Sequence, residues 1–429
     1  MKVLIIGSGG REHALAWKVA QSEAVRNVFV APGNAGTEAE PKVANVDIGA
    51  DDTNGLLRFA RDNDIGLTIV GPEAPLVAGV SDRFNSAGLK IFGPTRAAAQ
   101  LEGSKAFTKA FLERHRIPTA AYESFTELGA ALDYVSNAGA PLVIKADGLA
   151  AGKGVVIAES EGEAAAALKA MLVESRFGDA GQRVVVEEFL QGEEASFIAI
   201  VGGGKILSLA SSQDHKAVYD GDRGPNTGGM GAYSPAPVVD AGMHARIMRE
   251  VIEPTVSGLQ SEGLDYTGFL YAGLMIGEDG APRVLEYNCR CGDPETQPIM
   301  MRLQSDLVRL CEAAVDGDLG SLKADWSDEV CVGVVMASAG YPGEYASGDP
   351  IDGLGDALRG TKVFHAGTAM KEGRVVTAGG RVLCVCGLGK SVTDAQALAY
   401  RRVGQIRWSG VYYRTDIGYR AIAREKSRR

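Results

Sequence analysis

The first hundred residues repeat a strand, a glycine-containing turn and a helix, and this rhythm limits the fold more than any other feature. It reads KVLIIGSGGREHALAWKVAQS, then NVFVAPGN, then GLTIVGPEAPLVAGVSDRF, then LKIFGPT. Such alternation predicts a parallel β-sheet wound with helices. Ligands of these sheets bind at the carboxyl ends of the strands. We therefore expect binding at the turns GSGGRE, APGN and GPEAPL.

Composition excludes several classes of partner. The formal net charge of -10 argues against nucleic-acid binding, because counterion release needs clustered Lys and Arg. The apolar run in MKVLIIGSGG is too short for a signal peptide, and no run approaches the ~20 residues that cross a bilayer. We expect neither a nucleic-acid nor a membrane partner. The pairs Cys289/Cys291 and Cys384/Cys386 lack the usual zinc spacing, which favours reduced thiols in a cytoplasmic protein over metal binding.

The turn GSGGREHA falls short of the dinucleotide-binding pattern. G-x-G-x-x-G needs a third glycine where the chain has Glu12, and the second strand ends without an acid for a ribose. We therefore exclude a nicotinamide cofactor and expect a phosphate at the helix N-terminus. The predicted substrate-binding residues here are Gly9, Gly10, Arg11 and Glu12, with Glu73 binding hydroxyls or an amine of the same ligand. A tight turn with a solvated acid is the simpler alternative.

The segment IKADGLAAGKGVVIA predicts a β-hairpin with a glycine-rich tip, since apolar residues rather than a helix follow the glycines. The tip residues Gly152, Lys153 and Gly154 are expected to fold over phosphates. Lys145 lies between apolar neighbours and should point inward, where a lysine requires an anionic partner such as a nucleotide phosphate. Lys105 begins a helix and opposes its dipole, so an anion is expected beside it as well.

Acidic residues follow the apolar strand in VVVEEFLQGEEASF. Glu187 and Glu188 end the strand, and Glu194 comes after a glycine. Because adjacent acids repel each other, this stretch taken alone indicates an exposed strand edge. Ligand binding is the alternative, since the stretch lies among other candidate segments.

The segment LEYNCRCGDPETQP places Glu286, Asn288 and Arg290 at alternate positions, which share one face of a strand roughly 7 Å apart. Glu and Asn offer oxygen ligands suited to Mg²⁺, and Arg290 would bind a planar anion such as a carboxylate or an acyl phosphate. A salt-bridged strand end is the alternative. The glycine-rich segment 211–233 has almost no aliphatic residues and is expected to be a functional or disordered loop.

From residue 7 to residue 422 the chain resembles the ATP-grasp enzymes, and within them the phosphoribosylamine–glycine ligase family. The resemblance rests on GSGGREHA, GPEAPLV, LEGSKAF, IKADGLAAGKGV, VEEFLQGEEASF, SQDHKAVYDGDRGPNTGGMGAYSPAP, YTGFLYAGLMI, EYNCRCGDPETQP and DIGYRA. It implies an α/β and α+β chain with an ATP-grasp fold. The implied parts are an N-terminal Rossmann-like parallel-sheet domain (1–103), a large subdomain (104–121 and 193–329), a lid subdomain (122–192) and a C-terminal β-rich domain (330–429).

The resemblance also implies a reaction: ATP-dependent joining of glycine to 5-phosphoribosylamine in purine biosynthesis, through glycyl phosphate. The residues implied to bind ATP are Lys105 and Lys145 at the phosphates, Gly152, Lys153 and Gly154 in the hairpin, Glu187 followed by the backbone of Glu188, Phe189 and Leu190 at adenine, and Glu194 at the ribose. Glu286 and Asn288 would hold Mg²⁺ or Mn²⁺. The implied catalytic residues are Lys145, Arg290 at the acyl phosphate, and Asp214 at the glycine ammonium.

Two departures from the family and two rival functions stay open. The strand GFLYAGLMI lacks the third metal-binding acid of related ligases, and Cys291 stands where phenylalanine is expected. The rivals are a ligase or carboxylase acting on formate or bicarbonate, and a nucleotide sensor without turnover.

The hairpin around residues 148–154 should close during turnover, because an acyl phosphate hydrolyses in water. No heptad stripe is present, so we expect a monomer. No general base is assigned.

Overall fold

The N-terminal unit is the predicted parallel sheet wound with helices. A computed structural model describes residues 1–149, 154–174, 181–320, 322–355 and 358–427 of the protein. The sheet has the order β3-β2-β1-β4-β5, with every pair parallel. Its strands are β1 (Lys2–Gly7), β2 (Asn27–Pro32), β3 (Val43–Asn45), β4 (Leu67–Val70) and β5 (Ile91–Phe92); its helices are α1 (Gly10–Ala20), α2 (Thr53–Asp62), α3 (Glu73–Ala78) and α4 (Val80–Ser86).

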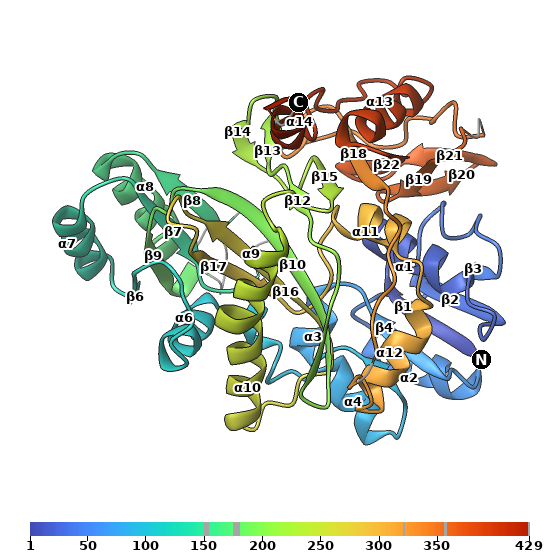
Figure 1. Ribbon diagram of the computed structural model, residues 1–429, viewed down its shortest axis with the longest axis horizontal. Helices are drawn as coiled ribbons and strands as arrows, with labels where there is room; N and C mark the ends of the chain where they lie inside the picture. The colour runs from blue at the N-terminus through green and yellow to red at the C-terminus, as the bar shows by residue number, and fades with distance from the viewer. Residues whose placement is uncertain (150–153, 175–180, 321, 356–357, 428–429) are drawn as a thin grey trace.

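An antiparallel sheet of order β11-β10-β16-β17 packs beside the first one (Figure 1). Along β1, Ile5 shares a core cluster with Ile198, and Ile6 shares another with Phe197. The two sheets therefore form one body with common cores. The elements of this part are β10 (Glu193–Gly202), β11 (Lys205–Ser208), β16 (Gly268–Ile276), β17 (Pro282–Asn288), α5 (Gln100–Gly103), α6 (Lys105–Arg114), α9 (Ala241–Ile247), a π-helical turn (Met248–Ile252), α10 (Glu253–Ser261), α11 (Thr296–Arg302) and α12 (Leu307–Val315).

A smaller unit projects at the left of Figure 1 and has a core cluster of its own. Its sheet has the order β6-β9-β7-β8. The antiparallel pairing of β7 with β8 confirms the predicted hairpin, whose residues 150–153 lie outside the described part of the chain. The elements are β6 (Tyr122–Phe125), β7 (Leu142–Ala146), β8 (Val155–Ala158), β9 (Val184–Glu188), α7 (Leu128–Ala138) and α8 (Glu161–Leu172).

The C-terminal sheet combines segments that are far apart in the sequence, in the order β12-β15-β18-β22-β19. Two of its strands come from the segment expected to be a loop, because the backbone groups of that segment pair with the sheet instead of staying open. The strands are β12 (Gln213–Asp214), β15 (Gly231–Ser234), β18 (Val330–Ala337), β19 (Thr361–His365) and β22 (Arg381–Gly389); the hairpins β13 (Ala217–Tyr219) with β14 (Arg223–Asn226) and β20 (Thr368–Lys371) with β21 (Arg374–Thr377), and the helices α13 (Val392–Val403) and α14 (Tyr419–Ser427), flank them.

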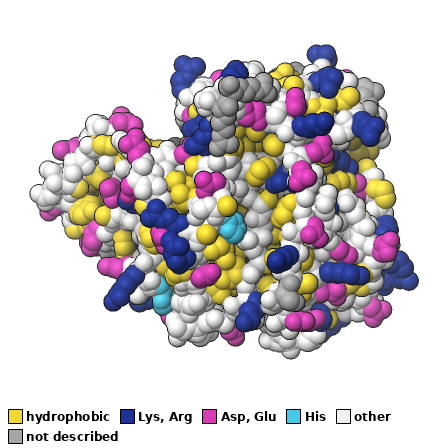
Figure 2. Space-filling model, in the orientation of Figure 1, with side chains coloured by type: hydrophobic (Ala, Val, Ile, Leu, Met, Phe, Trp, Pro, Cys, Tyr) yellow, Lys and Arg dark blue, Asp and Glu magenta, His cyan; other side chains and the backbone are white. Residues whose placement is uncertain are grey.

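Charged side chains of both signs are interspersed over the face of the molecule in Figure 2. Within the described residues, every helix is too short or too polar to span a bilayer.

Candidate active site

Strand β17 presents the candidate metal ligands. Glu286 and Asn288 alternate with Tyr287, whose side chain is buried in the core, so the two polar side chains point to the opposite face. Gly273 on β16 lies opposite Glu286 in the strand register, and the pairing is irregular just beyond it, at Leu285. The Nζ of Lys145 donates to the Leu285 carbonyl at 3.0 Å. The irregularity thus brings a lysine from the smaller unit to the start of the polar face.

The Glu286 carboxylate lies among cations that do not touch it. Burial raises its pKa, but Lys216, Lys145, Lys105 and Arg290 outweigh that effect, and the pKa lies below its usual range. Across the part of the chain that the structure describes, no ion pair or hydrogen bond reaches this carboxylate or the Asn288 amide. An ionised carboxylate beside a free amide oxygen suits Mg²⁺, which completes its shell with phosphate oxygens and water. No group of three or more His, Cys, Asp or Glu forms a further metal cluster among the described residues.

Lys145 belongs to a buried triad that sequence reading did not find. Glu187 accepts from Lys145 at 2.8 Å and from Lys109 at 2.9 Å, and its side chain is 3% exposed. The predicted exposed strand edge is wrong, because β9 lies between β6 and β7 in the sheet; the Glu187 side chain is buried, and only that of Glu188 is exposed. Burial lowers the pKa of Lys109 to about 8, against the pull of Glu187. Phe189 and Leu190 follow β9, both partly buried.

Lys105 lies near the carboxylates of Glu286 and Asp147 at the start of α6, but it forms no ion pair among the described residues. Asp147 accepts from Ala106 N at 3.2 Å and from Ser104 Oγ at 2.9 Å at the start of the helix, and Lys105 Nζ donates to the Gly148 carbonyl at 2.9 Å. Burial lowers the pKa of Lys105, with Glu286 opposing it. The hairpin closes with Ala146 N donating to the Gly154 carbonyl at 2.8 Å. Gly152 and Lys153 lie outside the described residues.

Arg290 is fixed by two acids. Its Nε donates to Glu73 at 3.1 Å and an Nη contacts Glu102 at 2.8 Å. Glu73, which was predicted to bind a hydroxyl or an amine, is thus paired with Arg290. This pairing agrees with the alternative interpretation of the Arg290 segment, a salt-bridged strand end. Burial raises the pKa of Glu102 to about 7, although Arg290 opposes the rise. Glu102 stands three residues before Lys105 in LEGSKAF, a signal that sequence reading missed.

The turn before α1 is occupied by a side chain of its own helix. Glu12 accepts from Gly9 N at 2.6 Å and from Arg11 Nε at 2.6 Å. A carboxylate thus takes the first N–H that was expected for a phosphate, which leaves less of the helix N-terminus open. Arg11 also donates to the Cys291 carbonyl at 3.2 Å, next to Arg290. Gly10 faces Gln297, whose amide nitrogen is 2.6 Å from where a side-chain carbon on Gly10 would stand.

Asp214 lies in an acidic part of the site. Burial raises its pKa to about 8; Glu295, Glu194 and Glu286 add to the rise, and Lys216 opposes it. Lys216 in turn pairs with Glu194 at 2.7 Å. The predicted ribose residue and the predicted glycine residue are therefore linked by a lysine two positions after Asp214, which sequence reading missed.

Asp293 and Arg381 connect this site to the C-terminal sheet, and neither was predicted. Arg381 on β22 contacts the Asp293 carboxylate at 3.3 Å and donates to the Asp293 carbonyl at 2.7 Å. It also donates to the Gly228 carbonyl at 2.5 Å. Asp293 belongs to the motif GDPETQP, which is the sequence signal that could have identified it as a site residue.

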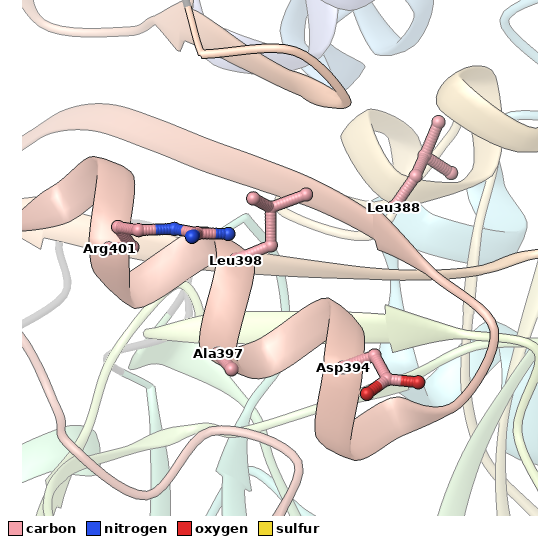
Figure 3. A pocket seen from close by; sticks show the side chains of 5 residues that line it. All are labelled: Leu388, Asp394, Ala397, Leu398 and Arg401. Atoms are coloured by element: carbon pink, nitrogen blue, oxygen red, sulfur yellow. The ribbon is translucent and has the colours of Figure 1, made fainter.

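A recess of about 540 Å³ elsewhere on the molecule involves none of these residues. It is lined by Leu388 of β22 and by Asp394, Ala397, Leu398 and Arg401 of α13 (Figure 3).

Family models match most of the chain. Models described as phosphoribosylglycinamide synthetase N domain, ATP-grasp (A) domain and C domain match residues 1–102, 103–296 and 331–420. The chain is 65% identical to a phosphoribosylamine–glycine ligase of Allochromatium vinosum and 63% identical to one of Vibrio cholerae, each over 429 residues and the full length of both chains.

Solved structures are similar over almost the whole chain. A phosphoribosylamine–glycine ligase from Thermotoga maritima has a TM-score of 0.85 and 34% identity, covering 97% of this chain and 100% of that one. A biotin carboxylase from Campylobacter jejuni has a TM-score of 0.73 at 14% identity, covering 99% and 98% of the two chains. At that identity the second likeness concerns the fold alone.

Proposed function

The chain belongs to the phosphoribosylglycinamide synthetase family, and we propose that it performs the ligation of that family on the polar face of β17. It is an ATP-dependent ligase of purine biosynthesis that joins glycine to 5-phosphoribosylamine. In the proposed route a glycine carboxylate oxygen attacks the γ-phosphorus of ATP, and ADP leaves. The amine of phosphoribosylamine then attacks the carbonyl carbon of glycyl phosphate, phosphate leaves with the bonding electrons, and the nitrogen gives up a proton.

The observation that carries this route is the ionised, uncontacted Glu286 beside Asn288. Phosphoryl transfer depends on alignment and charge neutralisation more than on covalent help from the protein. Glu286 and Asn288 would hold Mg²⁺ or Mn²⁺, which would neutralise charge on the phosphates when bound. Lys105 and Lys145 approach the same face from α6 and β7, where they would hold the phosphates.

The remaining nucleotide contacts follow the chain away from β17. Glu188, Phe189 and Leu190 would meet adenine through their backbone, with Glu187 holding Lys145 instead of contacting the base. Glu194 would bind the ribose hydroxyls. The hairpin residues, Gly152 and Lys153 with Gly154, would cover the phosphates and close during turnover.

Glycine and the acyl phosphate would lie between Asp214 and Arg290. An ionised Asp214 would bind the glycine ammonium, and the acids around it favour a cation there. Arg290 would bind the acyl phosphate with the N–H groups that Glu73, Glu102 and the Cys291 carbonyl leave free.

Phosphoribosylamine would bind at the start of α1, which lies beside Arg290. Gly10 and Arg11 would contact it, together with Gly9, Glu12 and Glu73. Arg11 and Arg290 both donate to the Cys291 carbonyl, which keeps the two guanidinium groups next to each other for an anionic substrate.

We also propose a cytoplasmic monomer with the four-part division given by the sequence. The separate core cluster of the lid residues supports treating 122–192 as a unit that moves against the rest.

The test is ADP release from the purified protein with each substrate omitted in turn. The proposal predicts that ADP forms only when ATP, glycine and phosphoribosylamine are all present. ADP release with bicarbonate or formate in place of glycine would favour a related ligase. ATP binding without turnover under any condition would favour a nucleotide sensor.

A further inference from the structure

The C-terminal segment contacts the chain immediately after Asp214. The backbone N–H of Gly418 donates to His215 Nε2 at 3.1 Å, and Arg414 donates to the Ala217 carbonyl at 3.0 Å. His215 is 3% exposed. In Figure 1, α14 accordingly lies next to β13 and β14. A segment about 200 residues further along the chain therefore holds the backbone next to Asp214, the residue predicted to bind the substrate glycine.

Arg424 of α14 makes a second and more direct contact. Its Nη1 donates to Glu193 Oε1 at 2.9 Å, and its Nη2 contacts Oε2, so the pairing is bidentate. Glu193 immediately precedes Glu194 at the start of β10. The Nε2 of Gln213 donates to Glu193 Oε1 at 2.7 Å and to the Glu194 carbonyl at 2.8 Å. Glu193 is thus the point where α14, the Glu194 strand and the Asp214 strand meet.

Gln213 transmits this contact because it has no freedom to rearrange. Its side chain is 1% exposed, and its Oε1 accepts from the hydroxyl of Tyr233 at 2.7 Å. Tyr233 is also its partner in the strand pairing of β12 with β15. A shift of the Glu193 carboxylate would therefore move Gln213 and the adjoining Asp214, or leave a buried amide unpaired.

Helix α14 is itself held firmly by the C-terminal part of the chain. Glu425 accepts from Val392 N at 2.6 Å and from Thr393 N at 3.2 Å at the start of α13. Ala421 is buried in the core cluster of the C-terminal sheet. These contacts hold α14 in place, so the guanidinium of Arg424 has a fixed position beside Glu193.

We propose that Arg424 is a positioning residue for the nucleotide and for glycine. By pairing with Glu193 it holds Glu194 and Asp214 in register across two strands, although it touches neither substrate. This inference rests on the proposed function, which assigns Glu194 to the ribose and Asp214 to glycine. It gives the C-terminal helix a role in substrate affinity that a brace for the sheet would not have.

The test is steady-state kinetics of the full-length protein with ATP, glycine and phosphoribosylamine varied in turn. For Arg424→Ala we expect KM to rise about tenfold for ATP and for glycine, a factor equal to ~1.4 kcal/mol, while KM for phosphoribosylamine and the thermal midpoint stay at their wild-type values. Arg424→Lys should restore part of the lost affinity, since lysine keeps the positive charge but cannot form the bidentate contact of the guanidinium with Glu193. Lys426→Ala is the matched control, because Lys426 is an exposed cation on the same helix.

A double-mutant cycle makes the test independent of how well one variant folds. Glu193→Gln should raise the same two KM values, and adding Arg424→Ala to it should raise them little further, because one interaction has already been lost. Unchanged KM values for ATP and glycine in both single variants, additive effects in the double variant, or a lowered thermal midpoint alone would overturn the inference. If the wild-type protein fails to release ADP with all three substrates, it is the proposed function that fails.

Discussion

The two halves of the candidate active site hold their carboxylates in different ways. On the α1 side, Glu12, Glu73 and Glu102 each contact an arginine, at 2.6, 3.1 and 2.8 Å. On β17, none of the described residues contacts the Glu286 carboxylate, although nearby cations lower its pKa. Asn288 beside it is equally free of side-chain partners among those residues.

The difference separates carboxylates whose charge is paired within the protein from a carboxylate that is left open to a cation. A carboxylate in contact with a guanidinium has its charge satisfied and serves to orient that cation. A carboxylate kept ionised by cations at a distance retains its lone pairs for a ligand, and a hard divalent ion with phosphate oxygens is the ligand that its chemistry favours. Glu286 should therefore tolerate substitution least, and the paired acids of the α1 side should tolerate it better.

The largest effect is expected for Glu286→Gln. The variant keeps the shape of the side chain but loses the charge, so turnover should fall about a thousandfold, equal to ~4 kcal/mol of lost metal-assisted stabilisation. Glu278→Gln, an exposed change on the turn between β16 and β17, should have no effect. Steady-state rates across a Mg²⁺ titration measure both variants. Near-normal turnover of Glu286→Gln at saturating Mg²⁺ would remove the distinction between the two halves.

Arg290→Ala should have the next largest effect and should act on the chemical step. We expect kcat to fall about a hundredfold, as for the loss of a donor to a developing anion, while ATP affinity stays close to wild type. If the alanine variant is unstable, Arg290→Lys can be measured in its place, because it keeps a cation beside Glu73 and Glu102. Single-turnover rates and ATP binding are the measurements. An unchanged kcat would refute the role.

Asp214→Asn should weaken glycine binding more than turnover. Loss of a charged hydrogen-bonding partner is worth ~2 kcal/mol, so KM for glycine should rise about 30-fold. Because the pKa of Asp214 is raised to about 8 and the ammonium requires the ionised form, wild-type kcat/KM for glycine should rise with pH up to about 8. The rise of kcat/KM with pH should be absent from Asp214→Asn. It should remain in Asp265→Asn, a control at an exposed position. Identical pH profiles in all three proteins would contradict the assignment.

Glu102→Gln should change activity least and show its effect in stability. The pKa of Glu102 is raised from 4.5 to about 7 in the folded protein. The folded state then binds a proton more tightly than the unfolded state, and the resulting stability, present below pH 4.5, is lost as pH rises through about 7. The free energy of unfolding of the variant, relative to wild type, should therefore rise over that interval. Urea unfolding across this pH range measures it, and a constant difference would contradict the prediction.

The sequence predicted the fold class where the signals are local. Strand, turn and helix follow one another in the N-terminal sheet, and the hairpin of β7 and β8 is marked by its glycines. The strands β12 and β15 were missed because they lie in a glycine-rich segment with few aliphatic residues. Their pairing with the C-terminal sheet is a long-range contact that no local pattern records.

The site shows the same limit. Alternation along one strand was enough to place Glu286 and Asn288 on the face opposite Tyr287. Lys109 and Lys216 were missed because their importance depends on which distant acid each one meets, Glu187 or Glu194. Burial of Glu187 was misjudged for a related reason: whether a strand lies at the edge or inside a sheet is decided by topology.

The most direct test of the account is a crystal structure with Mn²⁺ and a non-hydrolysable ATP analogue, with anomalous scattering locating the metal. We expect a manganese peak bound by Glu286 and Asn288 together with phosphate oxygens, with Lys105 and Lys145 on the same phosphates. A manganese site away from β17, with the Glu286 side chain turned into solvent or paired with a lysine, would contradict it.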